Sequence, residues 1–382
     1  MITTCFAKLV LISQQLFFIL LGFFGMGFLI GFHELGHFLF AKLFKIRIPS
    51  FSLGFGPRLI SKKIGETEFC LSAIPFGGYV EIAGAAEVGQ GEQKEALATD
   101  KGSFAVKPFY QKLCVMLGGI LFNLIFAYCA MILLFFAGIP KTPIMPNTVI
   151  STVQAGSAAE KHAFLSGDRI LSINEEIIGN NIQKLQTIIE PLALKEVTIV
   201  IERNGEKITK NVVIGSKATE TTTIGTLGVE FDFLPTPPHS LKDAIIKGIA
   251  LCNTWIKNTC AGFSNLFSRK GINNVAGPVM IIAMTVKGAA AGWQIFLLLL
   301  AIISINLAVL NLIPLPILDG GQILFYSIEA IIGRPIPNKV REYIHIATWI
   351  MFIILFIYLT TQDVSRIVSP YIDSVLKFFK LR

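Results

Sequence analysis

A run of 24 uncharged residues, Leu9–Phe32, is the feature that most limits what this chain can fold into. As a helix rising about 1.5 Å per residue, the run is longer than the roughly 30 Å hydrocarbon core of a bilayer. Charged residues make up only 15% of the 382 residues, against about 25% in globular proteins. The run shows neither the positive start nor the small-residue cleavage site of a signal peptide, so we expect it to remain as a membrane span.

Three further apolar runs complete the set of expected spans: about Cys114–Gly138, Trp293–Leu312 continuing to Leu318, and Ile344–Leu359. Four spans put both chain ends on the same side of the membrane. Basic residues gather after the first span, before the second, and between the third and fourth, and the positive-inside rule places these loops in the cytoplasm. The stretch from 141 to about 291 and both chain ends are then expected outside. The basic residues are Lys42, Lys45, Arg47, Arg58, Lys107, Lys112, Arg334, Lys339 and Arg341.

The sequence His33-Glu34-Leu35-Gly36-His37 follows the first run and puts ionisable groups at membrane depth, where they are costly and usually functional. On a helix, His33 and His37 share a face and can ligate one zinc ion, while Glu34 can activate a bound water. Two hydrogen-bonded histidines at a helix end are the alternative, but that interpretation leaves Glu34 unexplained. The pattern predicts a metal-dependent hydrolase.

A second motif, NLIPLPILDGG at residues 311–321, ends the third span. Its prolines and paired glycines break a helix, so the freed backbone groups must line a cavity or pack against protein. Asp319 by itself could be an ordinary turn residue. It is also the carboxylate that two histidines need to form a catalytic zinc site with its fourth position left to water. Because the first and third spans both run from outside to inside, His33 and Asp319 are expected to meet at the cytoplasmic leaflet.

These two motifs resemble those of the site-2 proteases, the M50 type of membrane-embedded zinc metalloprotease. The most similar members are the bacterial enzymes of regulated intramembrane proteolysis that cut anti-sigma factors, and the resemblance covers nearly the whole chain. It implies one Zn²⁺ ion per chain, held by His33, His37 and Asp319, with Glu34 as the catalytic general base. Gln322 stands where many relatives carry a basic residue, and we expect this departure to affect loop contacts more than zinc.

Weaker candidates for substrate binding lie between the motifs. The segments around 52–57 and 74–80 have the pattern of strands joined by turns. In the resembling family, the equivalent cytoplasmic loop offers a strand edge to extended substrate, whereas a purely structural hairpin is the alternative. Two asparagines match residues that the family places near substrate or transition state, and hydrogen bonding between helices explains them equally well. The candidates are Gly54, Phe55, Gly56, Gly77, Gly78, Asn123 and Asn311.

The segment 146–235 resembles a PDZ domain in the permuted form of bacterial proteases. Alternating runs on either side of Asn204-Gly205 give a strong hairpin signal. A loop on the closing strand would bind a peptide C-terminus by strand addition. One such domain is visible where some family members carry two, so a size filter that needs two is not expected. The loop residues are Gly225, Thr226, Leu227 and Gly228.

Three other segments have less specific patterns. Residues 87–102 are charged and poor in large apolar side chains, which indicates a linker. The apolar residues of Leu241–Phe267 are interrupted by charges, which favours an interfacial helix, since a fifth span would carry Asp319 away from His33. Residues 273–279 are typical of a re-entrant or interfacial turn. The net charge of +8 is spread along the chain, which argues against nucleic-acid binding.

The expected fold class is therefore a polytopic α-helical membrane protein with four transmembrane helices. It also has an inserted small cytoplasmic β-loop and one extracytoplasmic PDZ-like α/β domain. The expected boundaries are 1–43 for the first span with the HExxH motif, 44–113 for the membrane-associated β-loop and linker, 114–138 for the second span, 146–235 for the PDZ-like domain, 239–291 for interfacial amphipathic and re-entrant segments, 293–333 for the third span with the LDG motif, 344–361 for the fourth span and 362–382 for a C-terminal tail.

The resemblance implies a zinc-dependent intramembrane endopeptidase of the bacterial inner membrane. Its substrate would be the membrane span of a single-span protein, such as an anti-sigma factor or a remnant signal peptide, already trimmed outside by a site-1 protease. Other expected partners are the lipid bilayer and a peptide C-terminus at the PDZ-like domain, with no nucleic acid. A metal transporter and a non-catalytic metal-binding PDZ scaffold are the alternatives, and neither depends on Glu34 as a proteolytic base.

Overall fold

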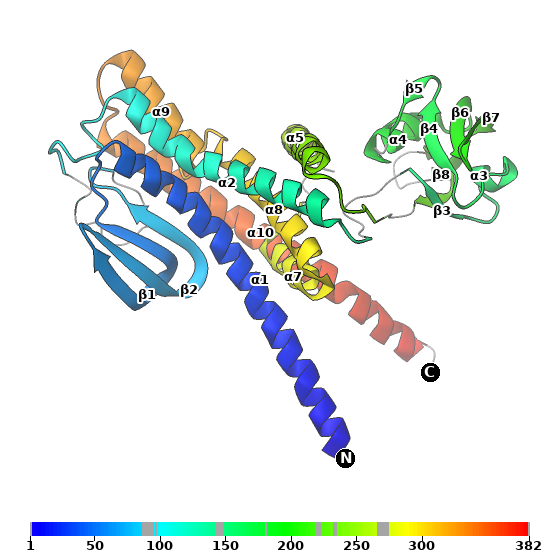
Figure 1. The fold of residues 1–382 in the computed structure, drawn as a ribbon, viewed down its shortest axis with the longest axis horizontal. Coiled ribbons are helices and arrows are strands. Elements are labelled where there is room, and N and C mark those ends of the chain that lie inside the picture. Colours follow the sequence, from blue (N-terminus) through cyan, green and yellow to red (C-terminus); the bar gives the residue numbers. More distant parts are fainter. Residues whose placement is uncertain are drawn as a thin grey trace. The chain divides into compact units, whose positions relative to one another are not determined.

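The structure is a computed structural model that describes residues 2–85, 95, 98–141, 148–179, 182–218, 223–231, 235–265 and 275–380 (Figure 1). The chain forms two compact units. One comprises Met1–Phe136 with His239–Arg382 and is called the membrane unit below. The other, Ala137–Pro238, is called the inserted unit.

Four helices of the membrane unit are long and apolar enough to cross a bilayer, and they correspond to the four expected spans. They are α1 (Ile2–Leu43), α2 (Phe109–Ala137), α8 (Trp293–Asn311) and α10 (Asn338–Lys380). Their membrane-compatible parts are Ile12–Leu43, Phe109–Ala137, Trp293–Asn311 and Lys339–Val368. Helix α10 continues without a break through most of the segment that the sequence indicates as a tail, so the fourth span and the tail form one element.

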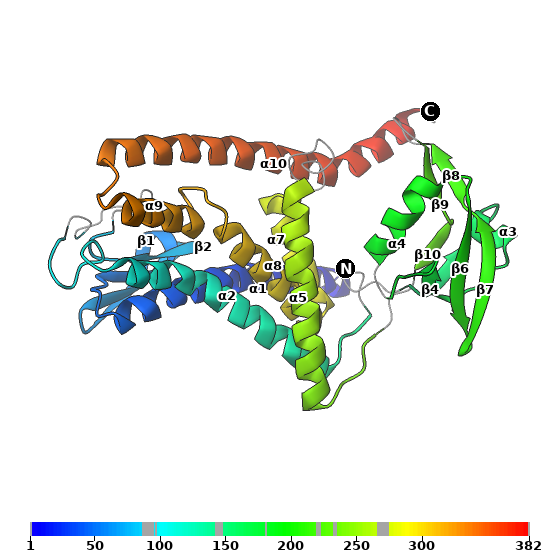
Figure 2. The same ribbon diagram turned by 90° about the horizontal axis from the view of Figure 1, so that it is seen from above.

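Three shorter helices complete the membrane unit: α5 (Leu241–Asn265), α7 (Pro278–Ala291) and α9 (Asp319–Ile332). Helix α5 is not among the four candidate spans and runs crosswise to α2, seen end-on in Figure 1 and lengthwise in Figure 2. The interfacial position expected for this segment stays a prediction. The turn expected at 273–279 lies partly outside the described residues, and from Pro278 the chain is helical and packs on α1, α8 and α10.

Helices α1 and α2 approach each other closely because glycines face one another where they cross. A Cβ on Gly36 would lie 2.9 Å from the backbone nitrogen of Gly119, and a Cβ on Gly118 would lie 2.7 Å from the carbonyl oxygen of Gly36. Contacts this short leave no room for a side chain, so the two backbones touch. This crossing holds the end of α1 that carries the histidines against α2.

Strands β1 (Ser50–Ile64) and β2 (Thr67–Glu81) form the expected β-loop, joined by a turn at Gly65. Both strands bend, so the pairing involves four segments. Ser50–Leu53 pairs with 68–71 on one side and with 78–81 on the other, while 60–64 pairs with 67–71. The buried side chains of this sheet join those of α1 and α2 in one apolar cluster. Because segment 78–81 pairs only with Ser50–Leu53, it lies at an edge of the sheet.

The inserted unit is a small α/β fold with an apolar core of isoleucine, valine, leucine and phenylalanine. A four-stranded sheet has the order β5-β4-β6-β7, beside the pairs β10-β3 and β8-β9. Asn204 and Gly205 both have positive φ (52° and 87°) and join β6 to β7, which confirms the predicted hairpin. The boundary expected at residue 146 lies outside the described residues. The elements are β3 (Ile150–Val153), α3 (Ala158–Lys161), β4 (Arg169–Ile173), β5 (Glu176–Ile177), α4 (Ile182–Ile189), a 3₁₀ turn (Glu190–Leu192), β6 (Glu196–Arg203), β7 (Glu206–Val213), β8 (Gly215–Ala218), β9 (Thr223–Thr226) and β10 (Val229–Phe231).

Candidate metal centre

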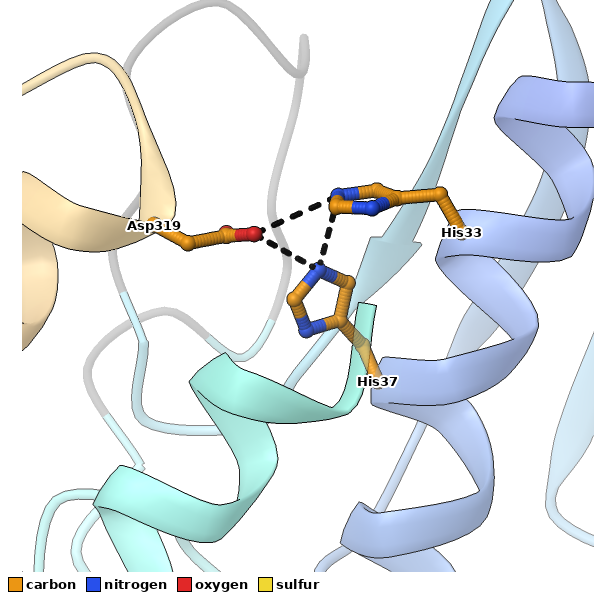
Figure 3. A group of neighbouring side chains, drawn as sticks. All are labelled: His33, His37 and Asp319. Carbon is orange, nitrogen blue, oxygen red and sulfur yellow. Dashed lines mark hydrogen bonds and ion pairs between the residues drawn. The ribbon is translucent and has the colours of Figure 1, made fainter. Parts of the chain in front are cut away.

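The three residues predicted as metal ligands lie together in the membrane unit (Figure 3). Helix α1 presents His33 and His37 one turn apart, with their Nε2 atoms 3.2 Å from each other. Asp319, the first residue of α9, directs Oδ2 to 3.3 Å from Nε2 of His33 and 3.5 Å from Nε2 of His37. Residues from opposite ends of the sequence therefore present one donor atom each to a common point.

These distances fit a zinc ion. Zinc bonds of about 2.0–2.1 Å in tetrahedral geometry separate the ligand atoms by about 3.3–3.4 Å, close to the three separations in this site. Oδ2 of Asp319 is also buried and has no hydrogen-bond partner among the described residues. A buried oxygen without a partner is costly, and a cation at this point would satisfy it. Two imidazoles and one carboxylate leave a fourth position for water or substrate, as in catalytic zinc sites.

The far side of each imidazole is held in a way that suits metal binding. Nδ1 of His37 lies 2.8 Å from the carbonyl oxygen of Val115, which can only accept a hydrogen bond, so Nδ1 carries the proton and Nε2 offers its lone pair. Nδ1 of His33 lies 3.1 Å from the side-chain amide of Asn123. If Nε2 of His33 binds metal, Nδ1 keeps its proton and the Asn123 amide must turn its oxygen toward it.

Gly119 on α2 forms the wall behind the histidines. A Cβ at this position would lie 2.8 Å from Nδ1 of His33 and would also touch Nε2 of His37, so any side chain would enter the space of the ligands. Gly119 was not predicted as a site residue. The signal was present as the Gly118-Gly119 pair, but its meaning depends on which face of α2 meets α1.

The glycines after Asp319 explain how the LDG segment reaches the histidines. A Cβ on Gly320 would lie 2.6 Å from the carbonyl oxygen of Ile313, and a Cβ on Gly321 would lie 2.6 Å from Cα of Pro316. The loop after α8 therefore folds directly onto the first turn of α9. The side-chain amide of Gln322 donates to the carbonyl oxygen of Pro316 over 2.9 Å and fastens the loop. This contact agrees with the expectation that Gln322 acts on the loop.

Glu34, the predicted base, lies next to His33 and borders the same cavity of about 340 Å³ as the three ligand candidates. Its carboxylate accepts a hydrogen bond from the backbone N–H of Val80 on β2. The β-loop thus contacts the site directly and holds the carboxylate beside the metal position. The walls of the cavity are otherwise mainly apolar, with Leu307 of α8 and Trp349 of α10 among them.

The seven weaker candidates for substrate binding divide into two groups. Four of them border the cavity, and the other three lie in the bends of the β-loop with positive φ between 84° and 103°. A Cβ on Gly54 would lie 2.6 Å from the carbonyl oxygen of Ile74, so these glycines give the β-loop its shape. The residues at the cavity are Phe55, Gly78, Asn123 and Asn311, and those in the bends are Gly54, Gly56 and Gly77.

The inserted unit has a cavity of its own, of about 240 Å³. It lies between α4 and the segment from β9 to β10, and the loop predicted to bind a peptide C-terminus forms one side of it. Glu190, an acidic residue, also borders this cavity. The loop residues there are Gly225, Thr226, Leu227 and Gly228.

Comparisons with known proteins identify relatives along nearly the whole chain. The sequence profile described as "Peptidase family M50" matches residues 21–357. Relatives in Campylobacter jejuni and Nostoc are each named "putative zinc metalloprotease" and are 30% identical to this chain, over 362 and 358 residues. The matches cover 90% and 91% of this chain and 92% and 96% of the relatives. A relative of the same name in Synechocystis is 31% identical over 351 residues, which is 88% of this chain and 91% of the relative.

Proposed function

This chain belongs to peptidase family M50, whose cofactor is zinc, and from that premise we propose that it is an intramembrane endopeptidase. The observation that carries the proposal is the convergence of His33, His37 and Asp319 at one point beside Glu34, at the end of a membrane-spanning helix. We propose that the first three residues hold the metal and that the fourth is the general base.

The reaction proposed is hydrolysis of a peptide bond. Zinc, when bound, polarises the scissile carbonyl and makes water more acidic. Glu34 accepts the proton of the attacking water on its carboxylate and then delivers that proton to the leaving amide nitrogen. The Val80 N–H fixes the direction of this carboxylate. The apolar walls of the cavity limit the water that reaches the bond under attack.

The edge of the β-loop suits a substrate whose helix has unwound. A helix hides its peptide bonds in its own hydrogen bonds, so a protease must extend the chain before cutting it. Segment 78–81 has one side paired with Ser50–Leu53, and Gly78 borders the cavity. We propose that the extended part of the substrate pairs with this edge and passes the metal centre.

We further propose that the substrate is a single-span protein already trimmed outside by a site-1 protease, such as an anti-sigma factor or a remnant signal peptide. The metal centre would open to the cytoplasm, because the basic loops flank its end of the spans. The inserted unit would then lie outside the bacterial inner membrane and bind a new peptide C-terminus. The inserted unit should therefore bind a peptide with a free C-terminus more tightly than the same peptide with an amidated C-terminus. Equal binding of the two peptides would contradict this part of the proposal.

The decisive experiment is cleavage of a single-span substrate by purified protein in detergent or liposomes. Glu34→Gln should abolish cleavage, by roughly a thousandfold or more, with zinc retained. Chelation should stop cleavage by the unsubstituted protein, and added zinc should restore it. Glu66→Gln, a matched change in the exposed turn of the β-loop, should leave activity unchanged.

Persistent cleavage by the Glu34→Gln protein would overturn the mechanism. A zinc-loaded, unsubstituted protein that cuts no substrate would favour a metal-binding scaffold. Zinc movement across liposomes that survives the same substitution would favour a transporter.

A further inference from the structure

Helix α10 has one face that is buried at His345 and at Asp363 and more exposed between them. His345, Trp349, Phe352, Phe356 and Asp363 recur at spacings of three, four or seven residues and so lie along one side of the helix. His345 is 4% exposed and Asp363 is fully buried, whereas Trp349 is 36% and Phe356 57% exposed, with Phe352 half-buried between them. A helix that packed along its whole length would bury this stripe continuously. The side of α10 that faces the protein is therefore left uncovered over its central turns.

The first turns of α10 are attached to α9 by polar contacts. Nε2 of His345 lies 3.4 Å from the amide nitrogen of Gln322, and the guanidinium of Arg341 pairs with Glu329 at 3.1 Å. The same guanidinium lies over the ring of Phe325. In both views α9 lies beside the first part of α10 (Figures 1 and 2).

The later turns of α10 are attached to α7. The Asp363 carboxylate accepts hydrogen bonds from the backbone N–H groups of Gly277 (3.0 Å) and Met280 (2.8 Å), at the start of α7. Arg366 donates to the carbonyl oxygen of Val275 over 3.0 Å. With α10 fastened on both sides of these turns, the uncovered stretch between Trp349 and Phe356 is a built feature of the fold and not the loose end of a helix.

The uncovered turns continue directly from the candidate metal centre. Trp349 borders the cavity that also contains Asp319. About two turns further along the helix, Leu355 and Phe356 are exposed and apolar, while Thr348, about two turns before Leu355, is buried. The surface therefore leads from the cavity along α10 toward its junction with α7, and it is apolar throughout. Such a surface fits an apolar helix lying within the membrane.

Resting on the proposed function, we propose that the central turns of α10, from Trp349 to Phe356, are the docking surface for the membrane span of the substrate. The occupant is an apolar transmembrane helix that lies along this face between the two attachments of α10. At the Trp349 end, the docked chain enters the cavity and unwinds next to Asp319. The attachments at His345 and Asp363 fix the position of α10 on either side of this surface.

Site-specific photo-cross-linking tests the proposal in the full-length protein. A photoreactive amino acid replaces Leu355 or Phe356 on the uncovered face, or Ile350 or Ile354 on the opposite, equally apolar face of the same turns. The Glu34→Gln background keeps the substrate whole. We expect cross-links to a single-span substrate from the first pair only. Cross-links from both faces alike, from the opposite face alone, or from Leu355 and Phe356 only to lipid or to a second copy of this chain would overturn the proposal.

Kinetics supply a second measurement on protein with Glu34 intact. Phe356→Ala should raise KM several-fold with kcat nearly unchanged, and Ile354→Ala should change neither. A lowered kcat with unchanged KM for Phe356→Ala would contradict docking. If the unsubstituted, zinc-loaded protein cuts no substrate, the proposed function fails and the docking surface with it. If it cuts while the cross-links come from the opposite face, only the docking surface fails.

Discussion

The inserted unit has an apolar core, whereas the membrane unit leaves many of its large apolar side chains exposed. The core of the inserted unit consists of apolar side chains such as Ile170 and Ile199. In the membrane unit, large apolar side chains such as Phe24 are exposed, while Asn123, Ser304 and Asp363 are fully buried. Lipid accepts apolar surface and cannot satisfy polar groups, so in the membrane unit it is polar residues that require burial. A buried polar side chain is therefore a much stronger indication of a site in the membrane unit than an apolar one.

Among the substitutions that test this difference between the units, the largest effect is expected at Gly119, which packs against His33 and His37. Gly119→Ala places a methyl group against His33 and His37, so we expect near-complete loss of bound zinc and of proteolysis. Metal analysis of purified protein measures the first and substrate cleavage the second. Gly262→Ala is the matched control, because a Cβ at that helical position meets open space. Normal zinc content in the Gly119→Ala protein would show that zinc binding does not require a glycine at this position.

Next in size is the effect of removing an apolar side chain from each unit. Ile199→Ala leaves a cavity in the core of the inserted unit and should lower its unfolding free energy by about 3 kcal/mol. Phe24→Ala removes a larger, exposed side chain and should change stability by less than about 0.5 kcal/mol. Hydrogen exchange of the two segments in the full-length protein measures both. Equal losses of stability in the two variants would contradict the proposed difference between the units.

The Asn123 amide tests whether buried polar groups of the membrane unit act on the metal. Asn123→Leu removes the acceptor for the Nδ1 proton of His33, so zinc affinity should fall by about 10- to 100-fold. Asn123→Asp keeps an oxygen in place and should preserve most of the affinity. Competition with a chelating dye gives both values without relying on activity. Similar affinities for the two variants would indicate that Asn123 only packs between helices.

The smallest expected effect concerns the buried charge of the inserted unit. Burial alone would raise the pKa of Asp168, but hydrogen bonds from Arg203 and from the backbone of Leu165 outweigh it and hold this pKa below its usual range. The ion pair therefore stabilises the fold above about pH 4, and the stabilisation is lost as the pH falls through the lowered pKa.

Asp168→Asn should accordingly cost about 1.5 kcal/mol at neutral pH and flatten the loss of stability in acid. Hydrogen exchange of the inserted unit as a function of pH measures this. If the Asp168→Asn protein loses stability in acid as steeply as the unsubstituted protein, other carboxylates cause that loss.

Several features could be predicted from the sequence because they depend on local pattern. Apolar run length identified the four spans, and Asn204-Gly205 identified the hairpin. The convergence of His33 and Asp319 was also expected, because loop charges predict the direction of each span and thus the end at which each motif lies. These predictions required no knowledge of how the helices pack.

Other features depend on packing between distant elements and could not be predicted. Gly119 was not among the predicted site residues, although the face of α2 that it occupies makes it part of the metal centre. Asp363 was assigned to a tail beyond the fourth span, yet it is buried and caps α7. Trp349 lies within the apolar run of the expected fourth span, and the run by itself does not distinguish it from a lipid-facing residue. Its position at the cavity follows from where α10 is attached, and that attachment has no signature in local sequence.

The three ligand candidates are far apart in the sequence and are therefore synthesised at different times. His33 and His37 leave the ribosome early, whereas Asp319 is made only after the inserted unit and α8. The donor set is thus incomplete until the segment that follows α8 has been synthesised. A growing or prematurely ended chain lacks the carboxylate that completes the site, so the order of translation itself delays metal capture until the protein is almost finished.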